Sequence, residues 1–303
     1  MAQAAYPDHV VKLIVPRPAG VVVDIIAREW RDKVNKTLGA TYIENMGGGG
    51  GVIGAVAAAR APADGYTLLL GTTSELVISP ILGHQSYSPA SFEPIAIICD
   101  SAAAIVVNPS VPVNNLQELV AYARNNKDKL SYGSAGAGTV SNLAGELFKR
   151  LTDLPDITHI PYKGGGPMVS DAIGGQVPIV TPMMSEQIFE LHRQGKLRIL
   201  AVASEKRLAA MPDIATAVEQ GYPNLVARLF VGLFAPAKTP KPILAKIEQA
   251  TQLAMQNPAL QKSFAAGGFE TLSKTDAASA ADYVNTEIVR WKPVLEQLGT
   301  KPQ

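Results

Sequence analysis

Apolar residues along this chain follow two alternating patterns, short β-branched runs and longer stretches with a helical period. Val11–Val15 is a β-branched run, and the apolar positions from Ile25 to Leu38 recur at the spacing of an amphipathic helix. The pattern then predicts a strand at Thr41–Glu44, a short helix at Val52–Arg60 and a third strand at Tyr66–Leu70. Because parallel strands joined by helices form a doubly wound sheet, the first third of the chain predicts an α/β fold.

Strand and helix patterns alternate again after a long apolar stretch, Ile95–Val107, and a second long stretch, Leu225–Phe234, precedes the last helices. This alternation predicts another doubly wound sheet. Strands are expected near Ser131–Gly133, Thr158–Ile160, Val177–Val180 and Arg198–Val202, and helices near Leu116–Asn126, Ser141–Leu151, Pro167–Gly174, Pro240–Asn257, Pro258–Ala265 and Asp276–Leu298.

The two long apolar stretches indicate where the chain crosses between two lobes. Each is longer than a usual strand, so we expect the first to leave lobe 1 and the second to return to it. Lobe 1 then comprises residues 1–101 and 227–303, and lobe 2 comprises residues 102–226. A hinge of two segments suits closure around a ligand. The alternative is two sequential domains with a linker near Pro109–Asn115.

Composition narrows the classes of function. The 303 residues are 47% hydrophobic, and the formal net charge of +1 gives no electrostatic basis for binding nucleic acid or an anionic membrane. Cys99, the single cysteine, lies in an apolar run and is expected to be a buried small hydrophobe. No apolar segment reaches the roughly 18 residues of a membrane-spanning helix. Ala2-Gln3-Ala4 fits the end of a cleaved secretory signal, so we expect an exported mature protein; an ordinary frayed start is the alternative.

Two glycine-rich turns each connect a β-like run to an expected helix, and the first of them extends from Pro16 to Asp24. The free N–H groups and partial positive charge of a helix start attract anions. Two such turns therefore suggest two lobes that grip one small anion. The candidate ligand-binding residues of the first turn are Arg17, Ala19, Gly20, Val21, Val22 and Asp24.

Two charged residues of the first turn have alternative roles. Arg17 lies between two prolines, so it loses less entropy when it forms a forked bond to a carboxylate. A solvated loop arginine is the alternative. Asp24 precedes Arg28 by one turn of the expected helix. It either complements the helix dipole and pairs with Arg28, or ties down the loop and excludes the wrong ligand.

The second turn, Tyr132 to Ser141, combines flexible glycines with groups that can cap a helix. Capping alone is the alternative to an anion cradle. Tyr162 opens a third glycine-rich loop, which in a parallel sheet should reach the same edge. The candidate ligand-binding residues here are Ser134, Ala135, Gly136, Gly138, Thr139, Ser141 and Tyr162.

No motif supports catalysis, a cofactor or a metal. Gly49–Gly54 satisfies the dinucleotide pattern G-x-G-x-x-G, but it follows the second strand and no suitably placed acid comes after it. Ser134 is not a nucleophile elbow, because Tyr132 stands where that motif requires glycine. The 4 histidines are scattered and lack the i, i+4 spacing of a metal site. We therefore expect no catalytic residue, no cofactor and no metal ion, and hence no enzyme.

Several motifs spread along nearly the whole chain carry a family resemblance. They include Ala63-Asp64-Gly65-Tyr66-Thr67-Leu68-Leu69, Tyr132-Gly133-Ser134-Ala135-Gly136 and His159-Ile160-Pro161-Tyr162-Lys163-Gly164. Through them the chain resembles the Bug family, the extracytoplasmic solute-binding receptors linked to tripartite tricarboxylate transporters. The resemblance implies an α/β protein of the type II periplasmic-binding-protein fold, a Venus flytrap of two doubly wound lobes. It also implies a carboxylated ligand held by loop N–H groups, small hydroxyls and water, which adds Thr72, Thr73, Ser74, Thr181 and Phe230 to the candidates.

The chain departs from the family pattern at two places. The family usually has an aromatic residue where Arg17 stands and small residues at Val21, Val22 and Val23, and its second lobe often has an acid near Thr181. These exchanges add a cation, remove an anion and make the first loop more apolar. We therefore expect a ligand with a larger apolar body and at least one carboxylate, such as an aromatic or medium-chain mono- or dicarboxylate.

The resemblance implies a non-catalytic transport receptor. Such a protein captures a small carboxylate between its lobes and delivers it to integral-membrane transporter subunits. A ligand sensor of the same fold that signals to a membrane partner is the alternative. We expect a periplasmic monomer that binds no nucleic acid.

Overall fold

The computed structural model describes residues 6–83, 86–126, 130–272 and 274–298. By its internal contacts the chain divides into two compact units. Unit 1 comprises Met1–Asp100, Phe230–Phe264 and Thr271–Gln303, and unit 2 comprises Ser101–Leu229 and Ala265–Glu270. The lobe boundaries expected from the sequence, 101–102 and 226–227, stay a prediction. The expected processing site, Ala2-Gln3-Ala4, lies outside the described residues.

Unit 1 is built on a sheet of 6 strands in the order β11-β4-β10-β3-β1-β2. Strand β1 pairs parallel with both β2 and β3, so their carboxyl ends meet at one sheet edge. Strand β10 pairs antiparallel with β3. The strands are β1 (Val11–Val15), β2 (Thr41–Asn45), β3 (Thr67–Thr72), β4 (Phe92–Ala102), β10 (Arg228–Pro236) and β11 (Glu270–Thr271).

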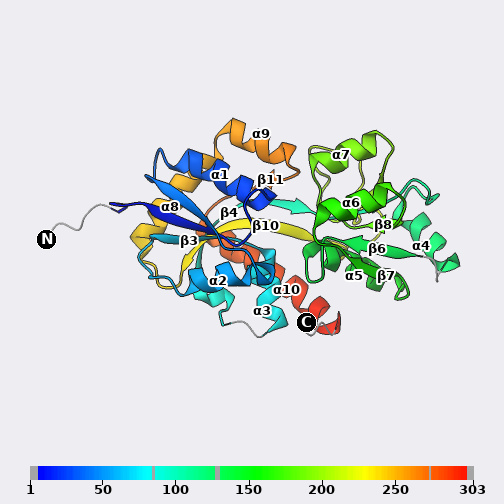
Figure 1. The fold of residues 1–303 in the computed structure, drawn as a ribbon, viewed down its shortest axis with the longest axis horizontal. Helices are drawn as coiled ribbons and strands as arrows, with labels where there is room; N and C mark the ends of the chain where they lie inside the picture. The colour runs from blue at the N-terminus through cyan, green and yellow to red at the C-terminus, as the bar shows by residue number, and fades with distance from the viewer. Residues whose placement is uncertain (1–5, 84–85, 127–129, 273, 299–303) are drawn as a thin grey trace. The chain divides into compact units, whose positions relative to one another are not determined.

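Helices cover both faces of this sheet, with α1 and α8 on one face and α2, α3 and α10 on the other (Figure 1). The helices are α1 (Val22–Val34), α2 (Val52–Ala59), α3 (Ser79–Leu82), α8 (Lys241–Met255), α9 (Pro258–Ala266) and α10 (Ala277–Leu298). Three shorter helical segments are η1 (Gly49–Gly51), the π-helical η2 (Ser74–Ile78) and η3 (Pro89–Ser91).

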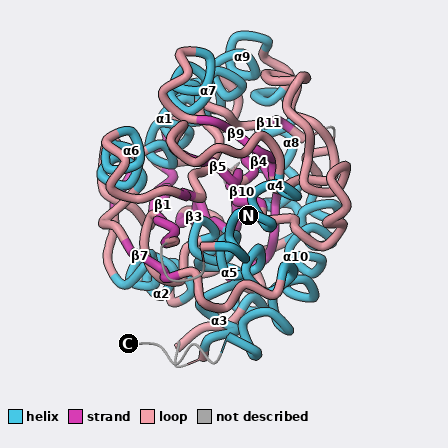
Figure 2. Tube along the Cα trace, turned by 90° about the vertical axis from the view of Figure 1, so that its right-hand side faces the viewer, coloured by secondary structure: helices cyan, strands magenta, loops and turns pink. Residues whose placement is uncertain are grey.

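Unit 2 has a sheet of 5 strands in the order β7-β6-β8-β5-β9. Strand β6 pairs parallel with β7 and β8, whereas β5 pairs antiparallel with β8 and β9. Helices α6 and α7 cover one face and α4 and α5 the other, so the strands lie inside helical layers (Figures 1 and 2). The strands are β5 (Ala104–Val107), β6 (Ser131–Ser134), β7 (Thr158–Pro161), β8 (Ile179–Val180) and β9 (Arg198–Val202), and the helices are α4 (Leu116–Asn125), α5 (Val140–Thr152), α6 (Gly165–Ile173) and α7 (Glu186–Arg193).

Apolar residues spaced three and four apart explain why the helices pack on the sheets. The buried side of α1 carries Val23, Ile26, Ala27, Trp30 and Val34. Burial of such a stripe contributes roughly 25 cal/mol for each Å² of apolar surface removed from water. Because this face of α1 packs in the core, the first turn of the helix and the loop before it are held at the edge of the sheet.

The α/β fold with two doubly wound sheets that the sequence predicts is confirmed, and each sheet also contains antiparallel pairs. Strands β10 and β5 run antiparallel to their neighbours because the chain enters them from the other unit rather than through a crossover helix. The stretch Ile95–Val107 is divided at Ala103 between β4 and β5. The pattern also missed α7 and the η2–α3 segment. The second of these begins with a π-helical turn, whose apolar residues do not follow the period of an α-helix. Cys99 is buried, as expected.

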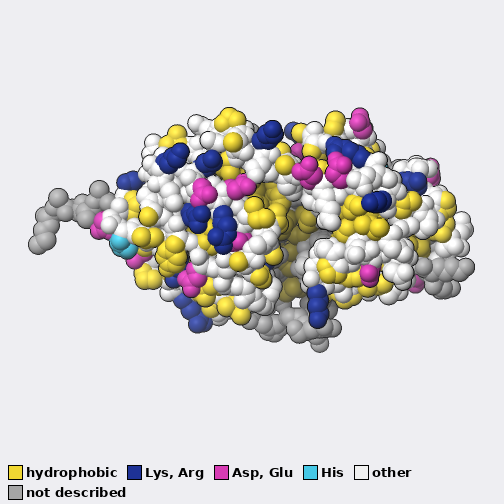
Figure 3. All heavy atoms as spheres, turned by 45° about the horizontal axis from the view of Figure 1, so that its top comes forward, with side chains coloured by type: hydrophobic (Ala, Val, Ile, Leu, Met, Phe, Trp, Pro, Cys, Tyr) yellow, Lys and Arg dark blue, Asp and Glu magenta, His cyan; other side chains and the backbone are white. Residues whose placement is uncertain are grey.

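Charged side chains of both signs are interspersed on the face of the molecule shown in Figure 3. The near-neutral formal charge of +1 agrees with this mixture. In the part of the chain that the structure describes, no helix has the length and apolar character needed to cross a bilayer.

Gly54 in α2 provides a test of this packing. A Cβ at Gly54 would lie 2.9 Å from the carbonyl oxygen of Met46 and 3.0 Å from Cα of Pro16, and these backbone atoms cannot rotate away. We expect Gly54→Ala to destabilise the protein by about 1–3 kcal/mol despite the better helix propensity of alanine. The matched control is Gly174→Ala, because a Cβ there has its nearest atom at 3.6 Å. Chemical unfolding that found equal stabilities for the two variants would contradict the close packing of α2 on the loops.

Candidate functional site

The loop between β1 and α1 is held by the buried carboxylate of Asp24, which is 1% exposed. Asp24 accepts hydrogen bonds from the N–H of Gly20 at 2.8 Å, from Arg28 at 2.9 and 3.1 Å, and from Asn45 at 2.9 Å. Asn45 also donates to the carbonyl of Arg17 at 3.1 Å. Asp24 therefore pairs with Arg28, as one of its two expected roles has it, and also ties down the loop, as the other has it; exclusion of the wrong ligand stays a prediction.

The ionisation of Asp24 follows from these contacts. Burial alone would raise its pKa, but the hydrogen bonds from Arg28, the N–H of Gly20 and Asn45, together with the charge of Arg28, leave the pKa below the ordinary value of an aspartate. The carboxylate is therefore charged at neutral pH and already has its donors within the loop.

The first turn of α1 offers free donors beyond that carboxylate. Val21 precedes the helix with an extended backbone, and its side chain cannot cap the N–H groups of Val22 and Val23. Neither N–H has a partner among the residues that the structure describes. Val21 and Val22 are 38% and 42% exposed. The helix start thus combines unpaired N–H groups, a partial positive charge and exposed apolar side chains.

Arg17 is engaged inside unit 1. Its Nη1 donates to the carbonyls of Pro16 and Gly50 at 2.8 and 3.0 Å and forms an ion pair with Glu75. Its Nη2 lies 3.5 Å from Oγ1 of Thr72. The arginine side chain is 23% exposed and that of Glu75 is fully buried. A direct ligand contact by Arg17 stays a prediction. The alternative, a solvated loop arginine, is wrong because the side chain is paired with Glu75.

The residues after β3 link this loop to β10. Oγ1 of Thr73 accepts the N–H of Phe230 at 3.0 Å, and the N–H of Ser74 donates to Oγ1 of Thr72 at 3.2 Å. The side chain of Phe230 is fully buried, with its ring 5.6 Å from that of Tyr283 between centroids. Ser74 is half-buried. Ligand contact by Thr73, Ser74 and Phe230 remains a prediction.

The loop between β6 and α5 in unit 2 satisfies most of its donors internally. Ser141 accepts the N–H of Ala135 at 3.0 Å, Ser134 that of Gly136 at 3.2 Å, and Asn142 that of Gly138 at 3.1 Å. Oγ1 of Thr139 caps α5 by accepting the N–H of Asn142 at 3.2 Å. Thr139 is thus a helix cap, as one alternative has it, and the anion cradle stays a prediction.

Two further candidates of unit 2 lie beside this loop. The hydroxyl of Ser141 donates to the carbonyl oxygen of Thr181 at 2.6 Å, and the hydroxyl of Thr181 donates to the carbonyl oxygen of Ser141, also at 2.6 Å. Tyr162 donates its hydroxyl to Asp171 at 2.9 Å and its N–H to the carbonyl of Ser134 at 3.0 Å. Burial, together with the hydrogen bond to Asp171, raises the pKa of Tyr162. The ends of β6, β7 and β8 therefore meet at one edge, as the parallel pairing predicts.

Sequence reasoning missed His159 and Glu75. His159 on β7 lies 2.8 Å from Oγ of Ser134 through Nε2 and stacks on Tyr132 with centroids 4.8 Å apart. The serine–histidine contact resembles a nucleophile and its base, but Ser134 is fully buried and its hydroxyl also bonds the backbone of Gly136. Its evident effect is to hold the loop. The motif beginning at His159 was a usable indication of this role, whereas no local pattern joined Glu75 to Arg17.

In the described ranges, no group of three or more His, Cys, Asp or Glu could hold a metal ion.

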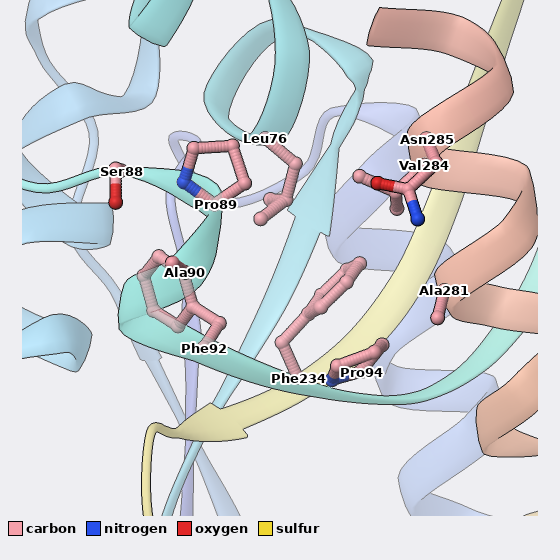
Figure 4. Close-up of a pocket in the computed structure, with 10 residues that line it drawn as sticks. All are labelled: Leu76, Ser88, Pro89, Ala90, Phe92, Pro94, Phe234, Ala281, Val284 and Asn285. Carbon is pink, nitrogen blue, oxygen red and sulfur yellow. The ribbon is translucent and has the colours of Figure 1, made fainter.

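A cavity of about 500 Å³ opens in unit 1, outside the loops described above (Figure 4). Its lining is mainly apolar and includes none of the predicted ligand-binding residues. The residues are Leu76, Ser88, Pro89, Ala90, Phe92, Pro94, Phe234, Ala281, Val284 and Asn285.

Comparison with known proteins identifies the family of this chain. Residues 26–300 match the model of the tripartite tricarboxylate transporter family receptor. The chain is 32% identical to the protein BugT of Bordetella pertussis over 304 residues, which cover 98% of this chain and 91% of BugT.

Two similar solved structures contain carboxylates. MatC from Rhodopseudomonas palustris with bound malate is 30% identical, with a TM-score of 0.81 and coverage of 96% of this chain and 100% of that one. A second R. palustris protein, solved with adipate, is 29% identical, with a TM-score of 0.84 and coverage of 97% and 98%.

The half-buried His159 of unit 2 predicts a loss of stability in acid. Burial lowers the pKa of His159; the charge of Lys149 lowers it further, and that of Glu146 acts in the opposite direction. The unfolded chain, with an ordinary pKa of about 6.5, then binds more protons than the folded one as the pH falls. The contribution of neutral His159 is complete above about pH 6.5 and is lost below it.

We expect His159→Gln to flatten the decline in the free energy of unfolding between about pH 7.5 and about pH 5. Burial also lowers the pKa of His192, so His192→Gln should remove a separate part of the decline, and the two effects should add. Urea unfolding at a series of pH values measures both. An unchanged slope in His159→Gln would contradict the account of this site.

The ion pair of unit 1 predicts an asymmetric mutational response. Arg17→Met leaves the carboxylate of Glu75 buried without its cation, which should cost about 3–5 kcal/mol. The double variant Arg17→Met/Glu75→Gln should be more stable than Arg17→Met alone, because it removes the uncompensated charge. The control is Arg31→Met, whose partner Asp32 is 61% exposed and whose loss should cost less than about 1 kcal/mol. Equal losses for Arg17→Met and Arg31→Met in chemical unfolding would refute the anchoring role.

Proposed function

The chain belongs to the tripartite tricarboxylate transporter receptor family, and from that premise we propose that it binds a small carboxylate and delivers it to membrane transporter subunits. Two similar solved structures contain malate and adipate, both dicarboxylates. The role requires binding and release of an unchanged solute, so the proposal includes no catalytic step. Periplasmic location, a monomeric state and a membrane partner form part of the same proposal.

The observation that carries this proposal is the uncapped start of α1. The N–H groups of Val22 and Val23 lack partners among the described residues, and Asp24 keeps the preceding loop in place. A carboxylate oxygen can accept such donors with the help of the helix dipole. In unit 2 the N–H groups of Ala135, Gly136 and Gly138 are already bonded within their loop, so the free donors of α1 carry the proposal.

The side chains beside these donors favour a ligand that is not wholly polar. Val21 and Val22 are exposed at the helix start, and burying such side chains against an apolar ligand is favourable. The proposed ligand is therefore an aromatic or medium-chain acid, whose carboxylate takes the free N–H groups and whose apolar body covers the valines.

Thermal unfolding with malate, adipate, hexanoate and benzoate tests the proposal. A ligand at about 100 times its dissociation constant adds roughly 2.7 kcal/mol to the stability of the folded protein. We expect such a shift with at least one of these acids and the largest shift with hexanoate or benzoate. No shift with any of them, and no binding by calorimetry, would refute the proposed function.

A backbone substitution tests the helix start itself. Val22→Pro removes one N–H at the first position of α1, where proline fits the helix, and the preceding Val21 already has φ −80° and ψ 162°. We expect nearly unchanged stability and an affinity about tenfold lower for the best acid, as for the loss of one charge-assisted hydrogen bond. The control is Glu186→Pro at the first position of α7, after Ser185 with φ −157° and ψ 163°. Equal affinity in Val22→Pro and wild type would exclude the start of α1 as the binding point.

A further inference from the structure

The carboxylate of Glu75 forms an ion pair with Arg17, as the carboxylate of a ligand could. Its Oε2 accepts the N–H of Thr72 at 2.9 Å and the hydroxyl of Thr72 at 2.6 Å, and its Oε1 contacts Nη1 of Arg17. Nη1 also donates to the carbonyls of Pro16 and Gly50. The most basic group of the first turn is therefore fixed by a carboxylate of the protein itself.

Gly51 makes room for this contact. Its backbone has φ +101°, a conformation that favours glycine. A Cβ at this position would lie 1.8 Å from Oε1 of Glu75 and 2.2 Å from Nη1 of Arg17. The glycine run before α2 thus has a structural purpose unrelated to nucleotide binding: it brings the backbone of η1 against the ion pair.

The charges of the first turn are balanced in pairs. Arg17 faces Glu75, and Arg28 faces Asp24. Both carboxylates are buried, so water screens them less than it would at the surface. A first ligand carboxylate can use the free N–H groups of α1, but a second one at this unit would find no uncompensated cation among these four residues and would be repelled by Glu75.

We propose that Glu75 is a specificity-determining residue, which makes this receptor prefer ligands with one carboxylate to those with two. This inference rests on the proposed function, because it concerns the ligand of the same loops. This preference for one carboxylate would distinguish the chain from the similar proteins whose structures contain the dicarboxylates malate and adipate. Glu75 acts through the charge of Arg17 and does not need to touch the ligand.

The experiment compares hexanoate with adipate, which have equal chain length and differ by one carboxylate. Calorimetric titration of wild type should give tighter binding of hexanoate. Glu75→Gln leaves the positive charge of Arg17 uncompensated and should shift the affinity ratio toward adipate by about tenfold, the order expected for one charge at short range in partly screened surroundings. The double variant Arg17→Met/Glu75→Gln, which restores the balance of charge, should return the ratio close to that of wild type.

The matched control is Glu287→Gln in α10. Glu287 is 2% exposed, pairs with Arg290 and accepts the indole N–H of Trp291. A general loss of stability should weaken both acids equally in either glutamine variant and leave the ratio unchanged. A change of ratio in Glu75→Gln alone supports the proposal.

Three results would overturn the inference, and one of them would also overturn its premise. Wild type that binds adipate as tightly as hexanoate refutes the charge preference without any variant, even if Glu75→Gln fails to fold. An unchanged ratio in a folded Glu75→Gln refutes the role of Glu75 while the receptor function stands. Binding of neither acid, nor of malate or benzoate, refutes the proposed function and the inference together.

Discussion

The loops of unit 1 depend on the ion pair between Arg17 and Glu75. A carboxylate without access to water must be paired, because an isolated buried charge costs far more than folding can supply. Glu75 meets this requirement through Thr72 and Arg17, and Arg17 in turn reaches the carbonyls of Pro16 and Gly50. One pair thereby joins the loops that follow β1, β2 and β3.

In unit 2, neutral groups rather than ion pairs hold the loop at the carboxyl end of the sheet. Its loop after β6 is held by Ser134, Ser141 and Asn142, which accept the N–H groups of Gly136, Ala135 and Gly138. Neutral hydrogen bonds inside a protein each contribute only about 0.5–1.5 kcal/mol net, so several are needed where unit 1 uses the ion pairs Arg17–Glu75 and Arg28–Asp24. The two loop clusters therefore occupy the carboxyl ends of similar sheets but differ in chemistry, charged in unit 1 and uncharged in unit 2.

Local contacts were predictable from the sequence and distant ones were not. The period of apolar residues located α1 and α5, and the spacing of Asp24 and Arg28 indicated their pairing. Arg17 and Glu75 are separated by the strands β2 and β3 and the helices α1 and α2, so nothing in the pattern could join them before the sheet order was known. The same holds for Gly51, whose role depends on atoms from two other loops, and for the antiparallel strands, whose direction is set by where the chain enters each unit.

The difference between the loop clusters has a consequence for any anion that approaches them. At the start of α1 an oxygen replaces only water on the N–H groups of Val22 and Val23. In the loop of unit 2 an oxygen that takes the N–H of Ala135, Gly136 or Gly138 must displace a protein oxygen already bonded there. Since exchanging one hydrogen bond for another gains little free energy, the start of α1 is the stronger anion donor of the two loop clusters.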